Sequence, residues 1–560
     1  ILSGTGSVTI TGNIGATALT SLDINQSAGT GSIRLSGDIG TASAAGAGVV
    51  RLGNDSLTGT ITFGGADYNT SGAQTYIADA YSMTGTDPDF ATDNDNIGFE
   101  DGNITLATVA DLTVDTGSGT TGNISIEGAI AGTSGGGTTT VTLEAGSGTV
   151  GVAGMGTDIG NVTIDGSGGV TLNGSITTSA GNIDINDATT LATGAITLTT
   201  ANGSVDFAST INGGQNLTIS SGSGAVGLNG VIGGTTTLGT LTINAASASN
   251  TSSGVITIED IGDGNTIGAG ATNIGNTNTT DLNLIGDTYK HGAAVYTAAS
   301  GNTIDLTDGA GNVTFTLSNA SLEFAGGNIE LSNGSDLVVG TGNGAITAAG
   351  IVGTSYEDVT LTTTGTLTIG TGGIGTGTTI EDINLDGGSI VLQGNIVTSA
   401  TGDTDADVDF DGAVVIDGAI SITTDVDGGT ADDGKIDFSS TINAEGSDTD
   451  SLTLNSGAGT ITLGGVIGGG TALDALTIDA TALTISNNIT TADGLIDINA
   501  PVTLGGDIVI SSGTGGGNVD FSSTITGGQA LDILSGTGNV IITGNIGATA
   551  LTSLDINQSA

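Results

Sequence analysis

Cysteine and tryptophan are absent from this sequence of 560 residues, proline occurs twice, and aromatic residues make up 3% of the chain. The lack of cysteine excludes disulfide bonds and zinc–thiolate sites. The scarcity of rings makes an ordinary globular interior, packed around leucine and aromatic side chains, difficult to build. A chain of this length must therefore bury its apolar residues in another way.

Basic residues are almost as scarce as proline. The chain has four basic residues and 57 acidic residues, which gives a formal net charge of −53. The basic residues are Arg34, Arg51, Lys290 and Lys435. Nucleic acids and anionic membrane surfaces attract proteins through clustered lysine and arginine side chains. The charge balance therefore excludes both as partners and leaves cations and neutral polymers.

Long apolar runs are missing too. No segment approaches the roughly 18 consecutive apolar residues of a membrane-spanning helix, so we expect no membrane insertion in this segment. The hydrophobic share is nevertheless 36% and the mean hydropathy is +0.24, whereas disordered chains have low hydrophobicity. Regularly placed Val, Ile and Leu among 103 glycines indicate a repetitive fold.

Short apolar triplets with one polar residue at the centre recur along the whole chain. Examples are "ITL" from Ile104, "LTV" from Leu112, "ISI" from Ile124 and "VTL" from Val141. Alternation with a period of two predicts short strands that turn two side chains inward and one Thr, Ser or Asp outward. The Gly-, Ser- and Asn-rich runs between the triplets are typical of turns.

A longer period connects these triplets. It is visible in three pairs of equivalent strand positions, separated by 24, 24 and 23 residues: Leu217 and Leu241, Leu452 and Leu476, and Leu531 and Leu554. Stacked coils of this length pair each short strand with neighbours about 4.8 Å away on both sides. We therefore predict an all-β fold, a continuous parallel β-helix (β-solenoid) of about 23–24 residues per coil that forms an elongated rod over residues 1–560.

The main alternative is a string of tandem β-sandwich domains. Such a chain predicts domain boundaries about every 100 residues and larger core side chains. Neither is visible in the sequence, and the solenoid is the preferred interpretation.

The phrase "GNIDINDATTLATGAITLTTANGSVDF", residues 181–207, is one of many Gly-, Thr-, Ser- and Asn-rich phrases of this kind. These phrases resemble the right-handed parallel β-helices of filamentous-haemagglutinin-like and autotransporter-passenger-like β-helix repeat adhesins of bacteria. The resemblance covers nearly the whole chain. It implies a fibrous protein that is secreted and extracellular, at the cell surface, and it carries no catalytic residue onto this sequence.

Residues 1–28 and 533–560 are two copies of one phrase. They differ only at Ser7/Asn539 and Thr9/Ile541, at a constant offset of 532 residues. This duplication predicts that the chain is a fragment of a longer repeat array. We expect units of about 532 residues to continue end to end, with copies of the same chain as partners.

Two segments, residues 64–117 and 285–342, interrupt the regular coils and resemble each other. They contain five of the six tyrosines and the only histidine: Tyr68, Tyr76, Tyr81, Tyr289, Tyr296 and His291. In one interpretation these are variant coils with larger side chains in the interior. In the other, Tyr68, Tyr76, Tyr289 and Tyr296 are exposed and form a lateral contact or a carbohydrate-stacking surface, with surface polysaccharide as the partner.

Acidic clusters suggest one cofactor, calcium. The phrase "DTDADVDFDG" places Asp407, Asp409 and Asp411 at the spacing of a calcium loop, although Gly418 occupies the position where such a loop has a bidentate Glu. A second cluster contains Asp93, Asp95 and Glu100. A third contains Asp425, Asp427, Asp432 and Asp433. The simpler alternative for all three is a strand or turn with a solvated acidic face.

Motifs of catalysis are not evident. The sequence has no P-loop and no Cys/His pair, so we expect that the protein is not an enzyme. We expect a structural role, as an extracellular fibre or adhesin stalk whose acidic rods form cell-surface filaments or a sheath. The alternative is a carbohydrate-active β-helix enzyme that uses paired carboxylates, or a carbohydrate-binding surface protein.

Overall fold

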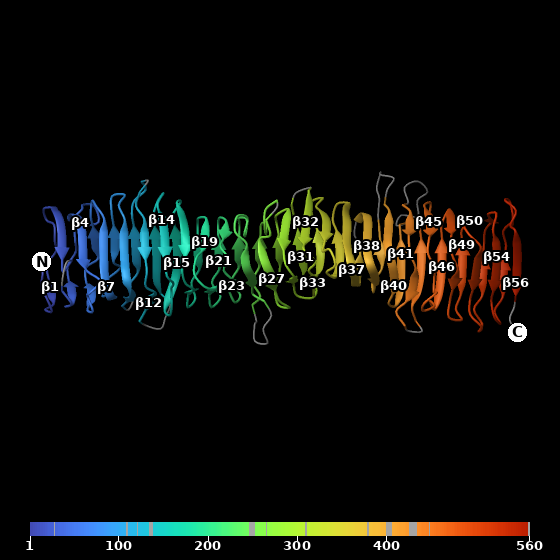
Figure 1. Cartoon of the computed structure of the whole chain (residues 1–560), viewed down its shortest axis with the longest axis horizontal. Coiled ribbons are helices and arrows are strands. Elements are labelled where there is room, and N and C mark those ends of the chain that lie inside the picture. Colours follow the sequence, from blue (N-terminus) through green and yellow to red (C-terminus); the bar gives the residue numbers. More distant parts are fainter. Residues whose placement is uncertain are drawn as a thin grey trace. The chain divides into compact units, whose positions relative to one another are not determined.

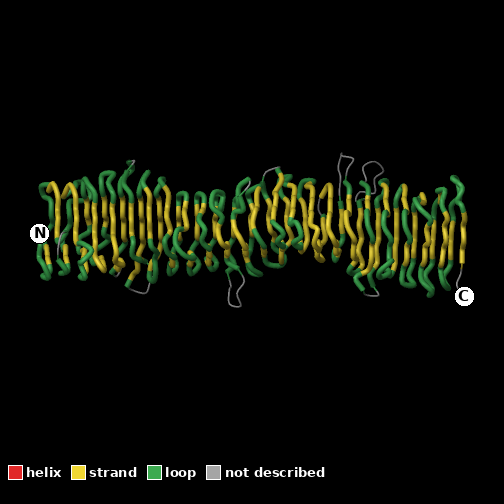
Figure 2. Tube along the Cα trace, viewed as in Figure 1, coloured by secondary structure: helices red, strands yellow, loops and turns green. Residues whose placement is uncertain are grey.

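The computed structural model describes residues 1–26, 29–107, 110–119, 121–133, 138–245, 252–264, 266–308, 311–377, 380–398, 406–424, 434–446 and 449–557. The chain forms two compact units, Ile1–Thr280 and Asp281–Ala560. The described residues of both units form strands and turns and contain no helix (Figure 2). None of them therefore belongs to a helix that could cross a membrane.

The first unit contains the strands β1 (Val8–Ile10), β2 (Leu19–Ile24), β3 (Ile33–Leu35), β4 (Ala47–Gly53), β5 (Thr60–Phe63), β6 (Asp67–Asn69), β7 (Gln74–Met83), β8 (Asp89–Ala91), β9 (Ile97–Leu106), β10 (Leu112–Asp115), β11 (Ile124–Ile126), β12 (Ile130–Gly132), β13 (Thr139–Glu144), β14 (Thr149–Val152), β15 (Ile159–Asp165), β16 (Gly169–Leu172), β17 (Ile176–Thr177), β18 (Ile183–Ile185), β19 (Thr189–Leu191), β20 (Ile196–Thr199), β21 (Val205–Phe207), β22 (Ile211–Asn212), β23 (Leu217–Ser220), β24 (Val226–Leu228), β25 (Leu238–Ile243), β26 (Ile256–Ile258) and β27 (Ala269–Gly275).

The second unit contains the strands β28 (Leu282–Leu284), β29 (Thr288–His291), β30 (Ala294–Thr297), β31 (Thr303–Leu306), β32 (Asn312–Leu317), β33 (Leu322–Ala325), β34 (Asn328–Leu331), β35 (Asp336–Gly340), β36 (Ile346–Gly353), β37 (Glu357–Ile374), β38 (Ile380–Leu392), β39 (Ile396–Val397), β40 (Val408–Ile416), β41 (Ala419–Thr423), β42 (Ile436–Phe438), β43 (Ile442–Ala444), β44 (Ser451–Asn455), β45 (Thr460–Leu463), β46 (Ala475–Asp479), β47 (Ala482–Ile485), β48 (Ile489–Thr490), β49 (Ile496–Asn499), β50 (Val502–Leu504), β51 (Ile508–Ser511), β52 (Val519–Phe521), β53 (Ile525–Thr526), β54 (Ala530–Leu534), β55 (Val540–Ile542) and β56 (Ser553–Asn557).

Each strand pairs in parallel with the equivalent strand of the next coil, and within each unit the stacked coils form a β-solenoid, with about 22 turns in all. Within each unit, neighbouring strands in Figure 1 follow one another in sequence order. In the stack β18–β21–β24, for example, Ile183 lies opposite Val205, and Val205 lies opposite Val226. The predicted fold class is therefore confirmed. Tandem β-sandwiches are excluded, because their sheets are antiparallel.

The three predicted coil equivalences are also confirmed at the level of single residues. Leu217 pairs with Leu241, Leu452 with Leu476, and Leu531 with Leu554. The coils are less uniform than the sequence suggests: one step spans 19 residues, from Leu483 to Val502, and another spans 29, from Leu112 to Val141. The turns absorb these differences in part, and β-bulges shift the register within some pairings, such as β13 with β15 and β37 with β38.

Alternation along the strands separates the core from the surface. In β18, Ile183 and Ile185 are fully buried, whereas Asp184 between them faces outward and is half-buried. Burying a side chain such as Ile stabilises the fold by about 1.5–3 kcal/mol relative to leaving it exposed. Stacked Val, Ile and Leu residues therefore supply the interior that the few aromatic residues could not.

Polar side chains satisfy backbone groups where the chain turns between strands. The Asn161 carboxamide oxygen accepts a hydrogen bond from the N–H of Asn182 (2.9 Å), and the Asn182 oxygen accepts one from the N–H of Ser204 (3.0 Å). Inside the turns, a buried Ser or Thr hydroxyl donates to the carbonyl of a glycine three residues later, as Thr341 does to Gly344 (2.6 Å). Such contacts give the buried groups of a turn the partners that they need.

The tyrosine side chains of the two variant segments lie in the interior of their units. Tyr68, Tyr76, Tyr289 and Tyr296 each have an exposed fraction of 0%. The prediction that these four tyrosines form an exposed contact surface is therefore wrong. The alternative, larger side chains in the interior of variant coils, describes their positions, because the rings pack on neighbouring rings: Tyr68 stacks on Phe90 and Tyr296 on Phe324.

The lone histidine belongs to the same interior. His291 Nε2 lies 2.8 Å from the Tyr296 hydroxyl, and Nδ1 lies 3.1 Å from the carbonyl oxygen of Gly292. These contacts fit a neutral imidazole that carries its proton on Nδ1. Burial lowers the pKa of His291 to about 4, although the backbone contact opposes that shift. His291 is therefore an uncharged core residue at neutral pH.

Gly233 tests the close approach of successive turns. It has a φ of +68°, and a Cβ at this position would overlap the backbone of Gly268. We expect Gly233→Ala to destabilise the first unit by about 2 kcal/mol or more, because the substitution adds both strain and a clash. Thermal unfolding measures the effect. Gly214→Ala is the matched control, since a Cβ there has open space; an equal loss for both variants would contradict the prediction.

Candidate functional site

The structure places Asp407, Asp409 and Asp411, which the calcium prediction grouped in a loop, at alternate positions along one extended segment. On β40, Val408 and Phe410 are buried, Asp409 is half-buried and Asp411 is exposed. The segment is thus a strand with alternating faces, and Asp407 directly precedes it. This is the simpler of the two alternatives from the sequence.

Of the other two acidic clusters, one lies within the described residues and one lies outside them. Asp93 and Asp95 lie in the turn between β8 and β9, and Glu100 lies on β9. Asp425, Asp427, Asp432 and Asp433 lie outside the described residues. Over the described ranges, no group of three or more His, Asp or Glu side chains is arranged to hold a metal ion. Calcium binding stays a prediction.

A regular row of carboxylates follows the second unit from coil to coil. In this row, which we call the aspartate ladder, each carboxylate accepts a hydrogen bond from the backbone N–H of the equivalent residue one coil later. The donor–acceptor pairs are Asp358 to Asp336 (2.9 Å), Asp382 to Asp358 (3.1 Å), Asp407 to Asp382 (2.9 Å) and Lys435 to Asp407 (2.8 Å). Charge-assisted bonds of this kind are stronger than neutral ones, and they fix the register of each coil against the next.

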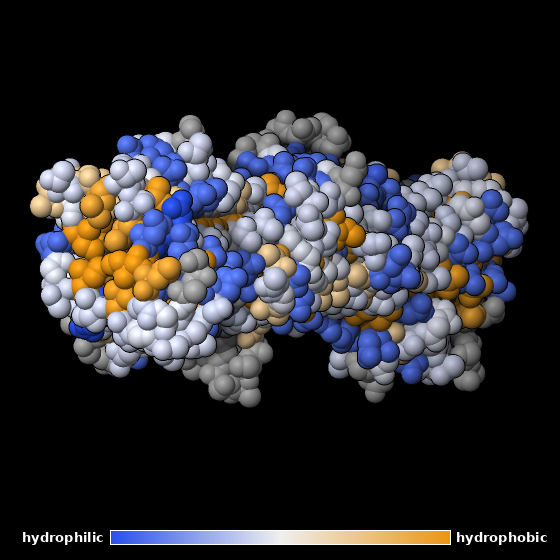
Figure 3. Space-filling view, turned by 60° about the vertical axis from the view of Figure 1, so that its left-hand side comes forward, coloured by the Kyte–Doolittle hydropathy of each residue, from blue (hydrophilic) through white to orange (hydrophobic). Residues whose placement is uncertain are grey.

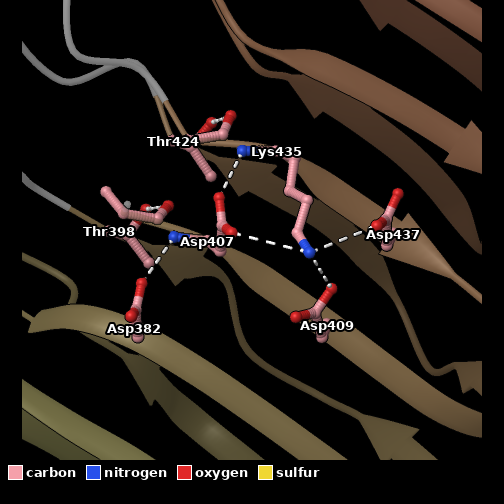
Figure 4. A network of polar contacts seen from close by, with 9 residues as sticks. Asp382, Thr398, Asp407, Asp409, Thr424, Lys435 and Asp437 are labelled. Carbon is pink, nitrogen blue, oxygen red and sulfur yellow. Dashed lines mark hydrogen bonds and ion pairs between the residues drawn. The ribbon is translucent and has the colours of Figure 1, made fainter. Parts of the chain in front are cut away.

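Lys435 ends the aspartate ladder and carries the opposite charge. Its ammonium group lies 3.5 Å from Asp407 Oδ2, 3.3 Å from Asp409 Oδ1 and 3.5 Å from Asp437 Oδ2 (Figure 4). Asp407 therefore binds the Lys435 backbone through one oxygen and the Lys435 side chain through the other. One lysine thus compensates carboxylates from two successive coils.

The pKa values around Lys435 reflect this crowding. Burial acts to lower the pKa of Lys435, but the three neighbouring carboxylates together raise it above its ordinary value. Burial raises the pKa of Asp409, and the ion pair with Lys435 only partly offsets that shift. The lysine is therefore firmly protonated at neutral pH, and the carboxylates still repel one another.

An open groove runs beside the aspartate ladder. It has a volume of about 260 Å³ and is lined by polar side chains of three coils: Asp358, Thr360, Asp382, Asn384, Asp407 and Asp409. A second open groove of about 380 Å³ lies on the other side of Asp409 and is lined in part by Asp411, Asp437 and Thr462. Both surfaces are acidic and hydrated, and they repel anionic ligands.

Stacked carboxylates also occur where no lysine contacts them. Asp184 lies opposite Asp206, Asp305 opposite Glu330, and Asp497 opposite Asp520. Burial, followed by repulsion from the facing carboxylate, raises the pKa of Asp184, Glu330 and Asp520. One buried oxygen of Asp305 and one of Asp520 accept no hydrogen bond. Parallel in-register stacking thus imposes an electrostatic cost on the fold.

Comparison of the chain with protein-family models, with curated proteins and with solved structures finds no match. The arrangement of the site is therefore the basis for any functional conclusion. Sequence reasoning placed Asp407, Asp409 and Asp411 on one strand but missed the aspartate ladder and the role of Lys435. The spacing of Asp336, Asp358, Asp382 and Asp407, which is 22, 24 and 25 residues, matches the coil length and is the signal that could have found the row.

The Lys435 ion pairs can be tested by removing the charge and keeping the aliphatic stem. We expect Lys435→Met to destabilise the second unit by about 1 kcal/mol, because partly exposed ion pairs contribute up to about that amount. Urea unfolding at low and high salt measures the difference, which should shrink as salt screens the carboxylates. Lys290→Met, which removes a lysine with no ion pair within 4 Å among the described residues, is the matched control. Equal effects for the two variants would refute the assignment.

The Asp497–Asp520 pair predicts a pH dependence. Because the pKa of Asp520 is raised in the folded state, protonation of Asp520 favours folding. This contribution to the free energy of unfolding is fully present below the ordinary carboxyl pKa of about 4 and is lost as the pH rises through the raised value. Asp520→Asn should therefore stabilise the fold by about 0.5 kcal/mol at pH 7 and have little effect at pH 3.5. Thermal unfolding at both pH values checks this, with the exposed Asp281→Asn as control. A gain that is the same at both pH values would argue against repulsion as the cause.

Proposed function

We propose that this protein is a structural segment of an extracellular fibre or adhesin stalk. The observation that supports the proposal best is the parallel, in-register pairing of each coil with the next, with apolar side chains inside and carboxylates outside. A solenoid of this kind lengthens by the addition of further coils and needs no new type of contact. The protein would serve as a stiff, hydrated spacer at the cell surface.

The chemistry of the surface agrees with this role. A net charge of −53 keeps such segments soluble and prevents their collapse onto one another. The partners that we propose are further copies of the same unit. Surface polysaccharide is a weaker candidate, because the tyrosines expected to stack on sugar rings are buried. For the same reason we do not favour a carbohydrate-active enzyme, and we propose a function without catalysis.

Cryo-electron microscopy of the native material tests the proposed function. We expect an unbroken filament with a layer spacing of about 4.8 Å and a sequence-related repeat one layer shorter than the about 22 turns of the chain, because its first and last coils are equivalent. The layer spacing reports the stacking of coils, and the longer repeat reports the joining of units. Discrete globular particles, or a membrane-embedded protein with no filament, would contradict a stalk or fibre.

A further inference from the structure

The two copies of the duplicated segment form equivalent strands. Val8–Ile10 in β1 corresponds to Val540–Ile542 in β55, and part of β2 corresponds to β56, each at the offset of 532 residues. The two positions that differ between the copies, Ser7/Asn539 and Thr9/Ile541, are exposed in both. The inward-facing residues are identical, so either copy fits the same neighbouring coils.

The copies use opposite edges of these strands. β1 and β2 pair with β3 and β4, which follow them in the chain. β55 and β56 pair with β52 and β54, which precede them. One sequence is therefore shown to accept a neighbouring coil on each of its two sides, in a defined register on each.

Burial is complementary in the same way. Ile1 has an exposed fraction of 62%, whereas its equivalent Ile533 is fully buried. Conversely, Ile556 has an exposed fraction of 45%, whereas its equivalent Ile24 is fully buried. Figure 3, in which the side that carries the N-terminus comes forward, shows apolar atoms gathered there. An apolar residue that is exposed in one copy is therefore buried at the equivalent position of the other copy.

We infer that the two segments are the same coil of a repeating array, which serves as the last coil of one 532-residue unit and the first coil of the next. A second copy of this unit then covers the open edge of β55 and β56. In that copy, the first residue after the shared coil is the one equivalent to Gly29. This inference rests on the proposed function, because it identifies the partner of the fibre segment. It is also an interface of the head-to-tail type, which generates open filaments.

The register of the joint follows from the pairs already present. Val540, Ile541 and Ile542 would lie opposite Ile33, Arg34 and Leu35 of the second copy, as Val8, Thr9 and Ile10 do within one chain. Asp555 would lie opposite Arg51 of the second copy. Its equivalent, Asp23, pairs with Arg51 at 3.3 Å within the chain. The joint therefore supplies a counter-charge to Asp555 as well as an apolar cover.

A tandem chain tests the joint directly. In this chain, Ala560 is followed by residues 29–560 of a second copy, and Ile541→Cys in the first copy is combined with Arg34→Cys in the second. Directly opposed residues of stacked strands have the Cα separation that a disulfide needs, and the natural chain contains no cysteine that could interfere. We expect this pair to oxidise as readily as the reference pair Thr9→Cys and Arg34→Cys in the single chain.

Two control pairs make the result decisive. Arg34→Cys with Thr62→Cys, both in the second copy, reports whether that copy is folded, because these positions are paired within the chain. Ile541→Cys with Thr62→Cys of the second copy lies one coil out of register and should stay reduced. Hydrogen exchange at Val540 should slow at least tenfold in the tandem chain relative to the single chain, because the N–H of the equivalent residue, Val8, donates to Ser32 of the following coil.

The inference is overturned if the joint pair stays reduced while the folding control oxidises, or if the out-of-register pair oxidises equally well. In that case the open edge belongs to a different occupant, such as a capping segment. The stalk proposal would survive that result, since it depends on coil stacking within the units. A native filament without this sequence-related repeat would likewise count against the joint alone.

Discussion

Parallel, in-register hydrogen bonding between successive coils is the constraint on which the rest of the structure depends. A strand of three or four residues is too short to persist alone, and it becomes stable only between equivalent strands on both sides. The register therefore has to be kept over every step, even where coils differ in length. Buried Ser and Thr hydroxyls, Asn carboxamides and the aspartate ladder hold each turn so that the next strand begins at the correct residue.

The same register brings like charges together. When a strand with an outward Asp is stacked on another, the two carboxylates face each other at the spacing of the coils. Burial, followed by repulsion from the facing carboxylate, raises the pKa of Asp184, Glu330 and Asp520 in such pairs. Lys435 relieves the repulsion at one position by contacting Asp407, Asp409 and Asp437. Elsewhere the fold tolerates the cost because the apolar interior contributes more. The acidic surface and the apolar core thus both result from the parallel, in-register stacking of the coils.

Much of this arrangement could be predicted from residue patterns, and the failures have physical causes. The pairing of Leu217 with Leu241 and the outward direction of Asp409 follow from period and alternation, which depend only on local geometry. The burial of Tyr68 and Tyr289 did not, because a tyrosine is compatible with both faces of a strand and its partner rings lie a coil away. The ladder that ends at Lys435 leaves a signal in the spacing of its aspartates, which is close to the coil length, but that spacing varies with the length of the turns and is not distinctive among 57 acidic residues.

The positions of the four basic residues have a consequence for the resistance of the fold to proteolysis. Arg34, Arg51 and Lys290 lie within paired strands, and Lys435 directly precedes β42 with its N–H bound to Asp407. A trypsin-like protease needs a lysine or arginine in an extended segment that can leave the fold and enter its active site. Lys435 is the only one of the four that lies outside a strand, and the hydrogen bond from its N–H to Asp407 holds it at the start of β42. The small number of basic residues and their positions together make the solenoid a poor substrate for trypsin-like proteases.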